Sequence, residues 1–224
     1  MNKKILITAA TGREMACLDL PAAGTDKILS TGTVLTRLVS GVGPVASVFS
    51  IMDYLSGNTS PDLIINIGIA GSYKSIYSPG SIVIPASDFF ADLGVCEPGG
   101  FIPADSAGLI EPGDEHTPSG KYFPDRYIDN LITLSLPRVN AITVSTATGS
   151  DEMKESLLNA FNPDIETMEG AAVYYLCTKK EIPCIAFRAV SNMVGPRDRS
   201  LWKIDYALEQ LAEVLGKSLN KLVL

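Results

Sequence analysis

Hydrophobic residues along the chain gather in short continuous runs, separated by glycine, proline and polar residues. Such runs are typical of strands that are buried on both faces, because a half-exposed strand would alternate hydrophobic and polar positions. The runs predict strands at residues 4–10, 26–30, 33–40, 61–71, 81–85, 140–145 and 184–190. The second and third runs are separated by Thr31 and Gly32, so we expect them to form a hairpin.

Helical patterns follow most of these runs. They predict helices near residue 14, at 45–55, at 123–136, at 151–161, in the alanine-rich segment that opens at Met168 and Glu169, and at the C-terminus. The last helix carries an apolar stripe at helical spacing, which indicates packing against a core. The stripe consists of Ile204, Leu208, Leu211, Leu215, Leu219 and Leu222. Residues 94–124 are rich in glycine, proline and acids and predict a long loop, which is either a cover over a site or a surface insertion.

The alternation of strands and helices indicates the α/β class. We expect a three-layer α/β/α sandwich with a central mixed, largely parallel sheet. A chain of 224 residues with 46% hydrophobic content can bury a full core within the size range of single α/β domains. Residues 1–224 are therefore expected to form a single domain.

Composition excludes several classes of function. A net charge of −7, an isoelectric point near 4.7 and scattered basic residues argue against a nucleic-acid partner. No apolar run approaches the roughly 18 residues that span a membrane, and the N-terminal run is too short for a signal peptide. The four cysteines show no C-x-x-C spacing, which suits small core residues of a cytoplasmic protein. Since His116 is the only histidine, we expect no multi-histidine metal site.

Three polar residues follow or border predicted strands. Glu14 comes after the first strand, Glu169 lies at the first turn of its helix, and Asn192 falls just past the strand at 184–190. In open α/β sheets, ligands bind at the carboxyl ends of strands, so we expect these side chains to face one site. The local pattern also allows both glutamates a purely structural role, because helix dipoles favour acids in a first turn.

A glycine-rich turn at residues 41–46 matches the G-x-G-x-x-G/A pattern of dinucleotide-binding proteins. The turn follows the third predicted strand rather than the first, and Asp62 begins a strand instead of closing one. We therefore expect no nicotinamide or flavin cofactor, although the turn can offer backbone amides to a polar ligand.

Three motifs resemble those of the nucleoside phosphorylase and nucleosidase superfamily, in the family's order. They are Asn-Ile-Gly-Ile-Ala-Gly at 66–71, Met-Glu-Gly-Ala-Ala at 168–172 and Arg-Ala-Val-Ser-Asn at 188–192. Residues 190–199, followed by Trp202, resemble the futalosine hydrolases most, which are nucleosidases of the alternative menaquinone pathway. The resemblance implies a cytoplasmic homo-oligomer, a dimer or larger, with a nucleoside substrate. It also implies hydrolysis of futalosine to hypoxanthine and dehypoxanthine futalosine, without a metal or organic cofactor.

The same resemblance implies roles for individual residues. Glu169 is expected to accept hydrogen bonds from the ribose 2′- and 3′-hydroxyls, while Met168 packs against the sugar. Glu14 aligns with a glutamate that takes a proton from water. The expected lining of the sugar and base consists of Ile69, Ala70, Gly71, Thr148 and Gly149. Arg13 leaves a phosphorylase as an alternative, because a cation in the site would hold phosphate.

Asn192 stands where the methylthioadenosine/adenosylhomocysteine nucleosidases, a second alternative, have an aspartate. An amide can donate to a 6-oxo group or N7 and accept from a ring N–H, which favours hypoxanthine over adenine, but it cannot deliver a proton. The benzoate arm of futalosine needs a cation, and the candidate is Arg197, with Arg199 and Lys203 beside it. Each of these cations also suits a surface position.

Two further questions stay open. The phenylalanines at positions 89, 90 and 101 can line the benzoate arm or pack in the core. A non-catalytic nucleoside-binding protein is the alternative from another class, although it would have no need of a water-activating carboxylate at Glu14.

Overall fold

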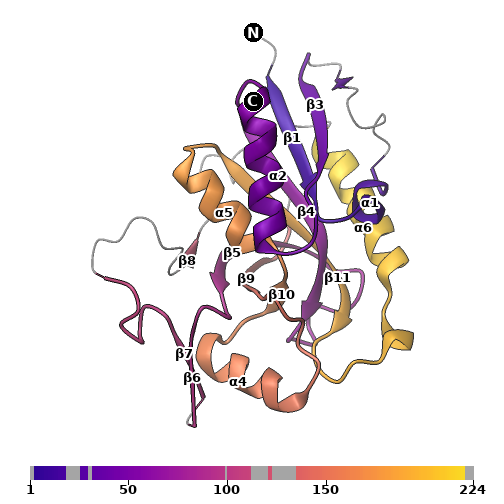
Figure 1. Cartoon of the computed structure of the whole chain (residues 1–224). Helices are drawn as coiled ribbons and strands as arrows, with labels where there is room; N and C mark the ends of the chain where they lie inside the picture. The colour runs from indigo at the N-terminus through magenta and orange to yellow at the C-terminus, as the bar shows by residue number, and fades with distance from the viewer. Residues whose placement is uncertain are drawn as a thin grey trace.

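The computed structural model describes residues 3–18, 26–29, 32–98, 100–111, 121–122 and 135–219, and shows a sheet with helices on both faces (Figure 1). The strands are β1 Lys4–Ala9, β2 Lys27–Ile28, β3 Val34–Val39, β4 Leu63–Ser72, β5 Ile82–Phe90, β6 Gly94–Glu97, β7 Gly100–Pro103, β8 Lys121–Tyr122, β9 Arg138–Thr143, β10 Ile165–Thr167 and β11 Cys184–Met193. The helices are α1 Gly12–Met15, α2 Pro44–Gly57, α4 Asp151–Phe161, α5 Gly170–Lys179, α6 Ile204–Leu219 and the short 3-10 helix η1 Arg199–Leu201.

The main sheet has nine strands among the described residues, in the order β10-β9-β5-β11-β4-β1-β3-β2, with β8 beside β5. Strands β3, β1, β4 and β11 run parallel to one another, as do β5, β9 and β10. The two groups meet in antiparallel pairings of two residues each, between β11 and β5 and between β10 and β4. The sheet is therefore mixed and largely parallel, as the sequence predicts.

The pairing of β10 with β4 closes part of the sheet. The sequence β4-β11-β5-β9-β10 returns to β4, so these five strands form a ring of paired neighbours. Because β10 runs antiparallel to β4, Glu166 lies opposite Gly71 and the chain after β10 passes close to the end of β4. This crossing places residues 166–169 beside the ends of strands that are distant in sequence.

Successive side chains of a strand point to opposite faces of the sheet and pack against the helices on each face. Ile5 and Ile7 of β1 pack in the cluster that contains Leu211 and Leu215 of α6, whereas Leu6 packs with Ile51 of α2. Helix α5 joins α2 on that second face, so the sheet lies between α2 and α5 on one side and α6 on the other (Figure 1). The predicted apolar stripe of α6 is buried at Leu208, Leu211, Leu215 and Leu219.

Several boundaries differ from the predicted ones. Strand β10 was not predicted, and α5 begins at Gly170, so Met168 and Glu169 precede the helix. The prediction that Asn192 falls past the end of its strand was wrong. Strand β11 continues to Met193 because a bulge at Ser191 lets Asn192 pair with Gly71.

The predicted loop at 94–124 contains regular structure where it is described. Strands β6 and β7 form a two-stranded antiparallel sheet, and β8 pairs with β5. Most of the predicted helix at 123–136, as well as His116 and Leu222, lies outside the described residues. None of the helices described is long and apolar enough to cross a membrane.

Candidate active site

A pocket with a volume of about 370 Å³ opens where the parallel strands β1, β4 and β11 end. Thr11 and Glu14 follow β1, residues 69–71 end β4, and Asn192 lies near the end of β11. Residues 166–169 reach the same pocket from β10, which crosses the end of β4. The topology thus brings together segments that are far apart in sequence, at the sheet edge where ligands bind in α/β folds.

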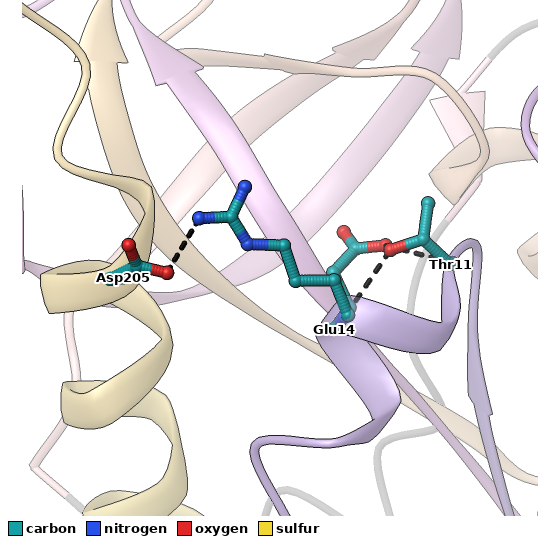
Figure 2. A network of polar contacts seen from close by, with 4 residues as sticks. Thr11, Glu14 and Asp205 are labelled. Carbon is teal, nitrogen blue, oxygen red and sulfur yellow. Dashed lines mark hydrogen bonds and ion pairs between the residues drawn. The ribbon is translucent and has the colours of Figure 1, made fainter.

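Glu14 is fixed by three donors at the wall of this pocket. Its Oε2 accepts hydrogen bonds from the amide and the hydroxyl of Thr11, at 3.0 and 2.7 Å (Figure 2). Its Oε1 accepts from the amide of Ile69 at 3.1 Å. In return the Thr11 hydroxyl accepts from the Glu14 amide, which completes a capping box at the start of α1. Glu14 therefore stabilises the start of α1 and lines the pocket with the same side chain.

Gly68 leaves the space that the Glu14 carboxylate occupies. A Cβ at this position would lie 2.8 Å from Glu14 Oε1 and 3.9 Å from Nη1 of Arg188. The backbone of β4 can thus approach the carboxylate closely only because residue 68 has no side chain.

Glu169 is the N-cap residue of α5, yet its side chain makes no cap hydrogen bond to its own helix. Its Oε1 instead accepts from the backbone amide of Gly43 at 2.9 Å, across 126 positions of sequence. Burial raises the pKa of Glu169 above its ordinary value, whereas the Gly43 amide and the positive charge of Arg188 lower it and Glu14 raises it further. A purely structural helix acid would cap its own helix, so this geometry argues against that interpretation.

The Gly43 contact also explains the glycine-rich turn. The amide that the turn presents is bound by a carboxylate of the protein itself, and Gly43 has a φ of 90°, in the region that favours glycine. The expected resemblance to a dinucleotide-binding turn does not extend beyond its spacing.

Arg188 is a buried cation that the sequence pattern included in a motif without giving it a role. Its side chain is only 2% exposed, and Nη1 donates to the carbonyl oxygens of Asn66 and Phe187 at 3.1 Å each. Nη2 donates to the side-chain oxygen of Asn66. The guanidinium is thereby held beneath the pocket floor, near Glu14 and Glu169. A charged residue inside the apolar run 184–190 was the signal for it.

Asn192 is oriented by its neighbour. The Ser191 hydroxyl donates to Asn192 Oδ1 at 2.8 Å, and Nδ2 donates to the Met193 carbonyl at 3.1 Å. The second proton of Nδ2 is then available to a ligand in the pocket, since a carboxamide nitrogen carries two.

A third acidic residue in the pocket wall, beside Glu14 and Glu169, was missed by the sequence pattern. Glu166 is 8% exposed and accepts from the Tyr73 hydroxyl at 2.8 Å and from the Thr148 amide at 3.0 Å. Burial, with Glu166 adding to it, raises the pKa of Tyr73 well above its ordinary value, so the phenol keeps its proton. Both oxygens of Glu166 are used, which makes it a support for the turn at Thr148.

The cations near the pocket mouth are differently placed. Arg13 forms an ion pair of 2.5 Å with Asp205 of α6, and Figure 2 marks this contact at Asp205. Arg197 is exposed at the pocket lining, with its guanidinium 5.4 Å from the ring centre of Trp202. The predicted site cation at 197 and Arg13 therefore both line the pocket, but Arg13 also pairs with Asp205, in a contact exposed to solvent.

Most of the predicted site residues line this one pocket. They are Glu14, Ile69, Ala70, Gly71, Thr148, Met168, Glu169, Asn192 and Arg197. Gly149 is not among the lining residues, although its neighbour Thr148 is. The phenylalanines at 89 and 101 each contact Phe161 of α4 and do not line the pocket. Across the described ranges, no group of three histidine, cysteine or acidic side chains could hold a metal ion.

Comparisons with known proteins give the relatives of this chain. The family model described as the phosphorylase superfamily matches residues 24–223. A futalosine hydrolase of Streptomyces coelicolor is 30% identical over 232 residues, which cover 97% of this chain and 94% of that protein. A futalosine hydrolase of Acidothermus cellulolyticus is 32% identical over 222 residues, with coverages of 93% and 87%. The native structure of futalosine hydrolase of Helicobacter pylori shares the fold, with a TM-score of 0.77, 18% identity and 98% of each chain covered.

The close approach of Gly68 to Glu14 leads to a prediction. In a Gly68→Ala variant, the new methyl group should displace the Glu14 carboxylate and break its bond to the Ile69 amide. The stability should fall by about 1–3 kcal/mol, because a hydrogen bond to a buried carboxylate is lost. A crystal structure and urea unfolding measure the two effects.

Gly57→Ala is the matched control, because a Cβ at Gly57 meets nothing within 4 Å. This variant should leave the Glu14 contacts as they are. An alanine at position 68 with the Glu14–Ile69 bond intact would show that the space is not reserved for the carboxylate.

Proposed function

Because the chain belongs to the phosphorylase superfamily and, within it, to the futalosine hydrolases, we propose that it hydrolyses the N-glycosidic bond of futalosine to hypoxanthine and dehypoxanthine futalosine. The observation that carries the proposal is the position of two carboxylates, those of Glu14 and Glu169, on one pocket. One is rigidly held by three donors, and the other keeps an oxygen free for ligand.

Glu169 supplies the sugar contact. Its Oε1 is bound by the Gly43 amide, so Oε2 faces the pocket with its lone pairs available to the 2′- and 3′-hydroxyls. Hydrogen bonds to a charged acceptor are about twice as strong as neutral ones. Met168, which also lines the pocket, packs against the sugar ring in this proposal.

Glu14 acts as the general base in this proposal. A carboxylate has about four lone-pair sites, and three donors leave one for a water molecule. As the glycosidic bond breaks, its electron pair moves to the departing base, the water oxygen bonds to the anomeric carbon, and Glu14 takes one water proton. The base leaves as an anion and takes a proton from solvent, and Glu14 then returns its proton to solvent. General-base help of this kind is worth about 10²- to 10⁴-fold in rate.

Water is favoured over phosphate as the nucleophile. The Arg13 charge is compensated by Asp205, and the Arg188 guanidinium is 2% exposed beneath the floor. A phosphate beside Glu14 would therefore meet a like charge, and the exposed cation of the two, Arg13, already pairs with Asp205.

The base and the 5′ arm are recognised at two ends of the pocket in this proposal. Asn192, oriented by Ser191, donates to N7 or O6 of hypoxanthine. The benzoate ring lies against Trp202 and Leu208, and its carboxylate pairs with Arg197. Arginine suits this task because its planar fork matches a carboxylate.

We further propose a homo-oligomer that acts in the cytoplasm, in the alternative menaquinone pathway. Large apolar side chains are exposed at the turn before α2 and in its first turns, namely Val42, Val45 and Phe49 at 54, 84 and 71%. Val42 also lines the pocket, so a second copy on this surface would lie beside the substrate. The four cysteines are free, which suits a reducing compartment.

The direct test is product release by the purified protein. Futalosine, inosine and methylthioadenosine are incubated with and without phosphate, and released bases are separated by chromatography. We expect hypoxanthine from futalosine, independent of phosphate. Adenine from methylthioadenosine would favour a methylthioadenosine/adenosylhomocysteine nucleosidase. Release that requires phosphate would favour a phosphorylase, and no release from any substrate would favour a nucleoside-binding protein.

The raised pKa of Glu169 predicts the pH dependence of binding. The ionised carboxylate is the better acceptor, so affinity should fall as the pH drops through its folded-state pKa, which lies above the ordinary 4.5. Below that pKa the affinity for futalosine should fall by up to about tenfold per pH unit.

Calorimetry on a Glu14→Gln variant isolates this effect from turnover. The variant also removes a charge that raises the Glu169 pKa, but burial is the larger cause, so the midpoint should stay above 4.5. A midpoint at or below 4.5 would contradict the assignment of Glu169 to the sugar.

Asn192→Asp tests the recognition of the base. A carboxylate should favour adenine over hypoxanthine nucleosides, and we expect the ratio of their kcat/KM values to shift by about tenfold or more toward adenine. Asn58→Asp, the same change at an exposed helix end, is the control. An unchanged ratio in Asn192→Asp would remove Asn192 from base recognition.

A further inference from the structure

Helix α5 begins with a substitute cap. Its N-cap residue, Glu169, directs its carboxylate to Gly43 and gives no cap bond to the helix. The first amides of the helix are bound instead by two threonine hydroxyls: Gly170 donates to Thr167 Oγ1 at 3.3 Å, and Ala171 donates to Thr143 Oγ1 at 2.8 Å. Amides at a buried helix start need acceptors. Because the threonine hydroxyls provide them, the Glu169 side chain is not needed as a cap and can extend to the pocket.

The threonine hydroxyls belong to a chain that ends at Asp88. Thr143 Oγ1 donates its one proton to Asp88 Oδ1 at 2.9 Å, so it acts as acceptor toward the Ala171 amide. The oxygens of Thr167 and Thr143 are 3.3 Å apart, and with the Thr143 proton committed, Thr167 is the donor of that pair. Every hydrogen bond of the chain therefore points from the helix start toward the Asp88 carboxyl.

Asp88 is packed directly under the first turn of α5. Its side chain is 0% exposed, and Oδ2 has no hydrogen-bond partner within the described residues. A Cβ at Gly170 would overlap Oδ2, so the helix start can rest on the carboxyl only because residue 170 is glycine. Burying a carboxyl oxygen without a hydrogen-bond partner is unfavourable. An explanation for its presence is therefore the hydrogen bond that Oδ1 accepts from Thr143.

Electrostatics agree with that arrangement. Burial raises the pKa of Asp88 to about 7, while Thr143, the charge of Arg188 and the Phe89 amide lower it and the charge of Glu169 raises it. Part of the population is neutral near pH 7, and a neutral oxygen is less costly to leave without a partner than a charged one.

We propose that Asp88 is a positioning residue for sugar binding: through Thr143 and Thr167 it holds the first turn of α5 and so directs Glu169 at the ribose hydroxyls. This inference rests on the proposed function, in which Glu169 contacts the sugar. Asp88 itself does not line the pocket. Its effect must therefore appear in how well the enzyme recognises the ribose hydroxyls, since a displacement of about 1 Å at a binding carboxylate can cost about 100-fold.

The test compares futalosine with 2′-deoxyfutalosine. The ratio of their kcat/KM values reports the contact between Glu169 and the 2′-hydroxyl, and it is insensitive to a uniform loss of active protein. In Asp88→Leu and Thr143→Val, this ratio should fall by about tenfold or more relative to the wild type. Thr143→Ser keeps the hydroxyl and should return the ratio to within about threefold, and the double variant should lose no more than either single one because both break one chain.

Ser87→Ala is the matched control. Ser87 precedes Asp88 on β5, is equally buried, and donates to the Asn140 side chain instead of to the α5 chain. Its loss should leave the ratio unchanged.

An unchanged ratio in folded Asp88→Leu and Thr143→Val would overturn the proposal, even if both rates fell equally. Thr143→Val alone decides the question if Asp88→Leu does not fold. A wild type that cleaves neither nucleoside would instead show that the proposed function fails, which is a different result.

Discussion

The buried guanidinium of Arg188 is the interaction on which the site depends. Asn66 and two backbone carbonyls hold it in the centre of the sheet, and its charge acts on Glu169 and on Asp88. Acidic groups gathered at one sheet edge would otherwise repel one another and shift toward their neutral forms. A fixed cation near them offsets part of that repulsion, while its own burial leaves little of its charge exposed to solvent.

The layers and the site edge could be predicted because they depend on local patterns. Apolar runs predicted most strands, the stripe from Leu208 to Leu219 predicted α6, and the end of the first strand marked Glu14. Family motifs then pointed to Met168 and Glu169. These assignments use information that lies close in sequence to the position concerned.

What the sequence could not supply is contact between distant segments. Strand β10 has three residues and no periodic signal, and its pairing with β4 is what brings Glu166 to the pocket. The bond from Gly43 to Glu169 spans 126 positions, and the Asp88 chain joins residues of β5, β9 and β10. The bulge at Ser191 likewise depends on how β11 meets β4, so the end of that strand was misplaced.

The ring formed by β4, β11, β5, β9 and β10 has a consequence for how the protein loses its structure. Within the described residues, each strand of the ring has a paired neighbour on both sides, with pairings of two residues each between β11 and β5 and between β10 and β4, which limits the edge that could recruit a strand from another chain. We therefore expect β4 and β11, the two pocket strands that belong to the ring, to open together with the core rather than before it, while β1 lies outside the ring. Heat inactivation and global melting should coincide for such a site, and slow amide exchange in these strands would mark the same unit.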